Sequence, residues 1–275
     1  MFDTIREMLA FPFMVRALTV GSLIALCAAL LGVSLVLKRY SMIGDGLSHV
    51  GFGALAVAAV LGAAPLALAI PVVVAAAFLL LRLSRASRIR GDSAIAVIST
   101  SALAFGVLVL SLGGGVNTDV YNYMFGSIYA METSDVVLSL ILCAVVLVMF
   151  VLLYHRIFAV TFDEDFARAG GLHVEAYNMT IAALTAVTIV IGMRMMGAML
   201  ISALIIFPPL TSMRVFKTFR SVTISSAVVS VVCFIAGITG SYLFDTPGGA
   251  SVVLTDLAAL LLFSLVGALR GRRRA

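Results

Sequence analysis

The chain has 275 residues, of which 63% are hydrophobic and only 11% are charged, with a formal net charge of +5 and a mean hydropathy of +1.20. A soluble domain needs far more charged surface, so this composition excludes a soluble globular protein and indicates that lipid surrounds the chain. The basic residues gather at the ends of apolar runs, which is typical of membrane topology and not of nucleic-acid binding.

The apolar runs predict an all-α fold, a polytopic bundle of helices that cross the membrane as a single domain over residues 1–275. A run of about 18 or more apolar residues is long enough to span the hydrocarbon core. We expect eight or nine spans, because the two runs within 177–213 are short and could form one broken element. The candidate spans are about 13–37, 41–62, 66–83, 93–113, 135–155, 177–193, 197–213, 221–243 and 251–269.

Basic residues follow every second run. By the positive-inside rule these connections are cytoplasmic, which predicts an N-terminus outside and a cytoplasmic C-terminus. The loops 114–134 and 244–250 then lie outside, and 82–92 and 156–176 lie inside. Among the other connections, Arg194 alone breaks the pattern. The residues that set the orientation are Lys38, Arg39, Arg82, Arg85, Arg88, Arg90, His155, Arg156, Arg214, Lys217, Arg220, Arg270, Arg272, Arg273 and Arg274.

An acid and an imidazole lie at the start of the second span, in the segment IGDGLSHVGFG. Asp45 and His49 are four residues apart, so on a helix they share one face. At about 1.5 Å per residue, His49 lies roughly 15 Å deeper than Arg39, near the middle of a hydrocarbon core about 30 Å thick. Ionisable groups at that depth are costly and usually face a bundle interior or a wet path.

The spacing of this pair leaves two interpretations open, a hydrogen bond that stabilises helix packing and a functional site. Small residues surround the pair, and they allow another backbone to approach while each glycine weakens the helix by about 0.5–1 kcal/mol. A structural pair does not require them, so they favour a functional site. The small residues are Gly44, Gly46, Ser48, Gly51 and Gly53.

The chemistry of the pair suits a transition metal. Carboxylate and neutral imidazole are ligands for Zn²⁺, Mn²⁺ and Fe²⁺, but two ligands do not hold a metal well. A two-fold dimer that brought both copies of this helix to its axis would supply two carboxylates and two imidazoles, the number that tetrahedral zinc requires.

An acidic segment, FDEDFARAGGLHVEAY, connects the fifth and sixth spans on the predicted cytoplasmic side. Asp163 is a suitable N-cap and Gly170-Gly171 a suitable end, which predicts a helix of about two turns. The helix could lie on the lipid interface or dock to another protein, and three consecutive acids argue against an anionic membrane surface. The residues available to dock are Phe162, Phe166, Ala167 and Ala169.

The chain contains no G-x-x-x-x-G-K-[ST] phosphate loop and no arrangement of catalytic side chains. We therefore expect a transporter subunit and not an enzyme. If transport uses ATP, another polypeptide must hydrolyse it.

Five segments in family order resemble the membrane permease subunits of ATP-binding-cassette importers for zinc, manganese or iron (the ABC-3 type). They are IGDGLSHVGFG, VYNYMFGSIYAM (120–131), FDEDFARAGGLHV (162–174), GAMLISALIIFPPLTS (197–212) and FDTPGGASVVL (244–254).

The resemblance implies a multi-pass homodimer in the bacterial cytoplasmic membrane. It implies as partners two ATPase subunits, which bind the ATP, and an extracytoplasmic metal-binding protein, with no permanently bound cofactor. Asp45 and His49 match the metal-contacting residues. The segment at about 162–174 matches the coupling helix that enters the ATPase, and the residues implied in coupling are Phe162, Phe166, Ala167, Arg168 and Gly171.

Zinc is the expected cargo, because several of these segments look closer to the zinc branch than to the manganese branch. Asp and His serve Mn²⁺ and Fe²⁺ nearly as well, so import of manganese or iron is an alternative. An ion- or proton-coupled secondary transporter that uses Asp45 and His49 as a proton relay is another, although it would not need a docking helix.

Three features fall outside the resemblance or depart from it. The methionines near residue 195 carry thioether sulfur, which suits copper(I). Methionine is also a common packing residue, and we favour the packing interpretation here. Asp256 matches no family motif, and we expect it to meet a partner at a helix end or in a loop. Cys27, Cys143 and Cys233 lie in apolar runs and are expected to be packed thiols. The methionines in question are Met193, Met195, Met196 and Met199.

Overall fold

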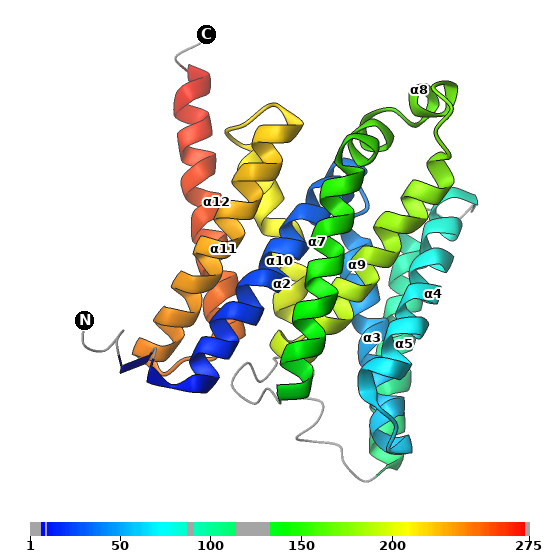
Figure 1. The fold of residues 1–275 in the computed structure, drawn as a ribbon, viewed down its shortest axis with the longest axis vertical. Coiled ribbons are helices and arrows are strands. Elements are labelled where there is room, and N and C mark those ends of the chain that lie inside the picture. Colours follow the sequence, from blue (N-terminus) through cyan, green and yellow to red (C-terminus); the bar gives the residue numbers. More distant parts are fainter. Residues whose placement is uncertain (1–6, 9, 87–90, 114–132, 273–275) are drawn as a thin grey trace.

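The computed structural model describes residues 7, 8, 10–86, 91–113 and 133–272, and within them every regular element is a helix. The all-α prediction is therefore confirmed. Figure 1 shows most of these helices running between the two ends of the molecule. The helices are α2 (Pro12–Leu37), α3 (Ser41–Leu61), α4 (Pro65–Ala86), α5 (Gly91–Leu112), α7 (Thr133–Phe162), α8 (Glu164–Ala169), α9 (Val174–Met196), α10 (Ala198–Met213), α11 (Phe219–Phe244) and α12 (Gly248–Arg272).

Eight of the described helices are long and apolar enough to cross a membrane. The prediction treated both runs within 177–213 as short, and for the first run this is wrong. Helix α9 has 23 residues, because it continues past polar residues such as Glu175 and Arg194 at its two ends. Only α10, with 16 residues, is too short. The described structure therefore favours eight spans and one shorter helix.

The connection between α9 and α10 is a single residue, Gly197, whose φ of 88° is accessible to glycine at little cost. Met196 before it and Ala198 after it are buried. The connection therefore lies inside the protein, which agrees with the broken element that the sequence left open.

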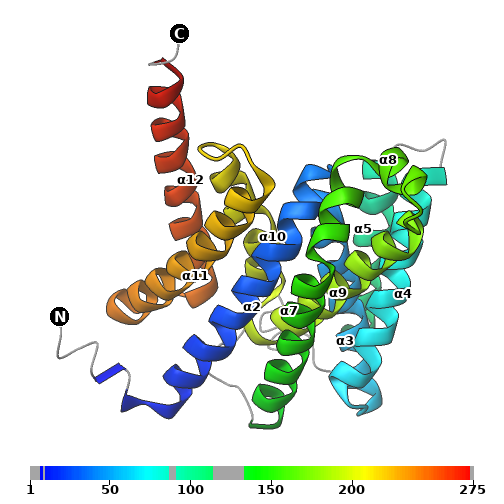
Figure 2. The ribbon, with the colours of Figure 1, turned by 45° about the horizontal axis from the view of Figure 1, so that its top comes forward.

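Helix α2 lies in the middle of the bundle, between α7 and α9 on one side and α10 and α11 on the other (Figures 1 and 2). Helix α3 packs mainly against α4 and α5 and also contacts α9 and α10. In α3 and in α9, 72% of the most apolar 18-residue segment is buried inside the protein, whereas in α12 this share is 11%. The helix that carries Asp45 and His49 is therefore a central one, while α12 leaves most of its surface for lipid or a partner.

The predicted cytoplasmic segments gather at one end. Figure 1 shows α8, the connection between α10 and α11, and the end of α12 together at the top, while the chain enters α2 at the bottom. Arg214, Lys217, Arg220 and Arg270 belong to these top segments. These four basic residues thus share one end of the fold, and the direction of that end in the membrane stays a prediction.

Cysteine labelling tests this orientation. In intact cells, Asp165→Cys is expected to react with an impermeant maleimide only after the membrane is permeabilised, because the rule of positive charges places α8 inside. Thr246→Cys, which is exposed at the other end, is the matched control and should react without permeabilisation. The three native cysteines are buried and should give little background. Labelling of residue 165 from outside would reverse the orientation.

Candidate metal site and docking helix

The local fold fixes the start of α3 to the end of α2. Only residues 38–40 separate the two helices, and Arg39 adopts a positive φ of 61° in this turn. The amide of Tyr40 donates to the carbonyl of Leu35 over 2.8 Å, which closes the turn against α2. At about 1.5 Å per residue, Asp45 and His49 lie roughly 6 and 12 Å along α3 from Ser41.

Asp45 and His49 face each other one turn apart, as the spacing predicts. The His49 Nε2 atom is 3.7 Å from the Asp45 Oδ2 atom, and the two side chains are 24% and 43% exposed in the single chain. A distance of 3.7 Å is within the range of an ion pair and longer than a normal hydrogen bond. The carboxylate and the imidazole keep surface available for a further group.

Helix α10 also reaches this region. The hydroxyl of Ser48, which is fully buried, lies 3.1 Å from the hydroxyl of Ser202 and donates to the carbonyl of Gly44. Ser202 is also a polar neighbour of the Asp45 carboxylate. Ser202 was not among the predicted site residues, because it is one of three hydroxyl residues in α10, with Thr211 and Ser212, and nothing in the sequence separates it from them.

The glycines of α3 have a packing role. A Cβ at Gly53 would lie 2.9 Å from the carbonyl oxygen of Ala102 in α5, and one at Gly51 would lie 2.6 Å from Met193 Cε in α9. A Cβ at Gly46 would lie 2.8 Å from Ile95 in α5. Close helix packing therefore explains these three glycines, and they do not by themselves favour a functional site.

Within the described residues, no three His, Cys, Asp or Glu side chains come together as a metal-binding group. One copy of the described structure thus offers a carboxylate and an imidazole at Asp45 and His49. A set of four ligands would require two further groups.

The docking helix forms as the sequence predicts. The Asp163 carboxylate accepts hydrogen bonds from the amides of Asp165 and Phe166 over 3.1 and 2.9 Å, and α8 ends at Gly170. Gly171 follows with a φ of 82° and open space around its Cα, so the chain leaves the helix through a glycine conformation. The predicted N-cap and helix end are confirmed.

The side chains of this helix divide into an exposed and a buried group. Phe166 of α8 is 74% exposed, and Phe162, the last residue of α7, is 58% exposed, although both are large and apolar. Arg168 is exposed and pairs with Asp165 over 3.3 Å. Ala167 differs from the expectation, because it is buried in a cluster with Val160 and Val174 and anchors α8 to the bundle. The surface open to a partner is therefore formed by the two phenylalanines.

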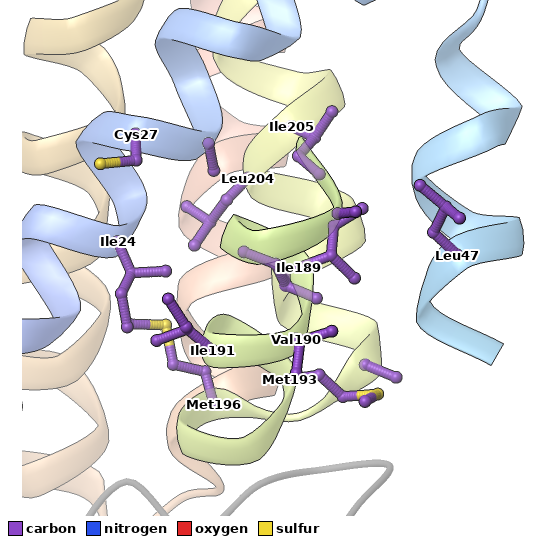
Figure 3. Close-up of a cluster of buried hydrophobic side chains, with 14 of the residues drawn as sticks. Ile24, Cys27, Leu47, Ile189, Val190, Ile191, Met193, Met196, Leu204 and Ile205 are labelled. Atoms are coloured by element: carbon purple, nitrogen blue, oxygen red, sulfur yellow. The ribbon is translucent and has the colours of Figure 1, made fainter. Parts of the chain in front are cut away.

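The methionines confirm the packing interpretation in part. Met193, Met195 and Met196 are buried in the main hydrophobic core, whereas Met199 is 38% exposed. Figure 3 shows Met196 near Ile24 and Ile191, with Met193 on the opposite side of α9, toward α3. The surroundings of the three buried thioethers are apolar, as in ordinary core packing.

Within the described residues, Asp256 meets no partner at a helix end or in a loop, contrary to the expectation. The residue lies within α12, is 1% exposed and has the Cys233 thiol of α11 as a polar neighbour. Neither carboxylate oxygen has a hydrogen-bond partner in the part of the chain that the structure describes. The sequence could not show this, because the burial of Asp256 depends on the packing of α12 against α11.

Comparisons with known proteins agree with this architecture. The family model described as the ABC 3 transport family matches residues 10–267. A manganese transport system membrane protein, MntC of Halalkalibacterium halodurans, is 27% identical over 94% of this chain and 89% of its own length. The high-affinity zinc uptake system membrane protein ZnuB of Haemophilus influenzae is 28% identical over 93% and 97%. In the structure of PsaBC from Streptococcus pneumoniae in complex with Fab, one chain superposes with a TM-score of 0.86, at 26% identity, over 95% of this chain and 94% of that one.

Proposed function

Since the chain belongs to the ABC 3 transport family and is a multi-pass membrane protein, we propose that it is the permease subunit of an ATP-driven importer of divalent transition-metal ions, with zinc as the cargo. The relatives named for zinc and manganese transport support the class of cargo. Their identities of 28% and 27% do not separate the two metals. Zinc is favoured by the donor set, because two carboxylates and two imidazoles match its tetrahedral preference.

The observation that carries this proposal is the Asp45–His49 pair, partly exposed on a largely buried membrane helix. In the proposed mechanism the two side chains replace part of the water shell of the cation, together with the same pair from a second copy. The charge of the carboxylates stabilises the dehydrated cation, and the neutral imidazole nitrogens donate lone pairs to it. The metal is the substrate and is released after each passage.

The proposed partners follow from the rest of the molecule. Phe162, Phe166, Arg168 and Gly171 form the surface that an ATPase subunit would receive, with one ATPase for each of two permease copies. An extracytoplasmic protein would deliver the metal at the end of the bundle opposite α8. Residues 1–275 would act as one permease domain in the bacterial cytoplasmic membrane.

A competition assay tests the cargo. With equal concentrations of Zn²⁺, Mn²⁺ and Fe²⁺, the complete complex in proteoliposomes is expected to accumulate mainly zinc, because N/O sites bind zinc more tightly than manganese or iron. Element analysis of the vesicles after ATP addition measures this. Vesicles with the permease alone are the control and should accumulate none. Dominant manganese uptake would contradict the zinc assignment, and full uptake without ATPase would contradict the ATP-driven importer.

A further inference from the structure

A buried lysine joins three parts of the fold. Lys38, in the turn between α2 and α3, has a side chain only 7% exposed, and its Nζ atom donates to Glu164 Oε1 over 2.6 Å and to Asn178 Oδ1 over 2.5 Å. Asn178 Nδ2 donates to the same Glu164 oxygen over 3.1 Å. The three side chains form a closed triangle between the α2–α3 turn, the first residue of α8 and the first turns of α9, which we call the Lys38 triad.

Because the Lys38 side chain is buried, the triad holds α8 firmly to the turn between α2 and α3. Lysine is almost never buried unless it is paired, and the loss of one partner leaves an uncompensated charge in a poor solvent. Glu164 is 33% exposed, so the carboxylate reaches in from the surface helix while the ammonium is enclosed. Asn178 is buried and uses its amide to bond both charged groups. Separation of α8 from Lys38 would therefore remove a charged partner from a buried ammonium.

The triad is connected to the candidate metal site through a short turn. The amide of Lys38 donates to the carbonyl of Ser34 over 3.0 Å, and the amide of Ile43 donates to the carbonyl of Tyr40 over 2.9 Å. Arg39 adopts a left-handed conformation in the turn between these bonds. Because only residues 38–40 separate α2 from α3, a displacement of the Lys38 backbone is passed to the start of α3, and Asp45 lies about one helical turn beyond that start.

A small cavity lies beside the triad. Its volume is about 20 Å³, enough for about one water molecule. It is bounded by Lys38 and Asn178 of the triad and by Tyr40, Ile43 and Leu81 from the turn, α3 and α4. The packing between the start of α3 and α9 is thus incomplete at this point.

We propose that Lys38, Glu164 and Asn178 are positioning residues that transmit movement of α8 to α3 and hence to Asp45 and His49. The inference rests on the proposed function, since it takes the movement of α8 from an ATPase. None of the three residues touches the metal. The triad holds α8 and the start of α3 in one arrangement, so that ATPase-driven displacement of one displaces the other.

The test measures zinc transported per ATP hydrolysed by the complete complex in proteoliposomes. Lys38→Met keeps the length of the side chain and removes its charge. It is expected to lower this ratio on the order of tenfold, within the range typical of coupling between sites, while ATP hydrolysis continues. Lys38→Arg keeps the charge and should retain most of the coupling. The exchanged pair Lys38→Glu with Glu164→Lys should recover part of it.

A matched control lies at the residue directly before Asn178. Arg156 Nη1 donates to the Tyr177 hydroxyl over 2.7 Å and its guanidinium lies 5.7 Å from the centre of the Tyr177 ring, so the pair ties α7 to α9, and Tyr177→Phe removes the hydrogen bond alone. Tyr177→Phe should leave the transport ratio unchanged. If any polar tie at this end were equally important, Tyr177→Phe would lower the ratio as Lys38→Met does, and the inference would be wrong.

If the complex with Lys38→Met fails to assemble, the variant Glu164→Gln tests the inference in its place. The glutamine has the shape of the glutamate and keeps a hydrogen-bond acceptor, so the complex should form with a lowered ratio. A parental ratio in an assembled Lys38→Met or Glu164→Gln complex overturns the inference. Failure of the proposed function is a separate result, because it would appear as absent ATP-dependent zinc uptake in the parental complex.

Discussion

Asp45→Asn and His49→Ala are each expected to abolish zinc import. The first removes two formal negative charges from a dimer and the second removes two imidazoles. Changes in the outer shell of a metal site already cost about 10–100-fold, so the loss of direct ligands should reduce transport by about 100-fold or more. Uptake of radioactive Zn²⁺ by proteoliposomes measures the effect.

Assembly should survive both substitutions. The two side chains are partly exposed and 3.7 Å apart, and such a pair contributes only about 0–1 kcal/mol to the free energy of unfolding. The purified variants should therefore co-elute with the ATPase and keep the parental melting temperature within a few degrees. A variant that imports zinc at the parental rate, or one that is lost through misfolding alone, would speak against a ligand role.

Phe166→Ala is expected to weaken binding of the ATPase subunit and to reduce ATP-driven transport strongly. Aromatic residues bury about 150–250 Å² each and dominate interface energetics. An anchor of this kind typically costs about 2 kcal/mol or more when truncated, which is roughly thirtyfold in the dissociation constant. Phe166 is 74% exposed at the tip of the molecule, so its truncation should not disturb the fold. Titration of the solubilised permease with purified ATPase measures the affinity.

Phe244→Ala is the matched control for this substitution. Phe244 is 78% exposed, ends α11 and lies at the end of the bundle opposite α8. Its truncation should leave ATPase affinity unchanged. Equal affinity of the Phe166→Ala and parental proteins would show that the exposed face of α8 is not the docking surface.

Much of the fold could be predicted because hydropathy reports directly on membrane spans. The predicted bounds of the second span, 41–62, differ from α3 by a single residue. The prediction failed where charge interrupts a helix, as at Arg194, since a hydropathy window ends there although the backbone hydrogen bonds continue. Asp163 was predictable as a cap because the relevant amides are two and three residues away.

The parts of the site that depend on distant contacts could not be predicted. Asp45 and His49 are neighbours by helix geometry alone, but Ser48 and Ser202 are 154 residues apart and meet only through the packing of α3 with α10. Lys38 was interpreted as a topology signal, because nothing in its local sequence indicates that Glu164, 126 residues away, encloses it. Ala167 was placed on the docking surface since helix spacing does not show which face the bundle covers.

The most direct test of the central hypothesis is zinc uptake by the double variant Asp45→Asn with His49→Gln. This pair keeps size, polarity and the ability to hydrogen bond, but it has no carboxylate and no imidazole. If the pair binds the cargo, the variant should assemble with the ATPase, hydrolyse ATP and import no zinc. If the assembled variant imports zinc at near the parental rate, the pair is structural and the metal passes elsewhere.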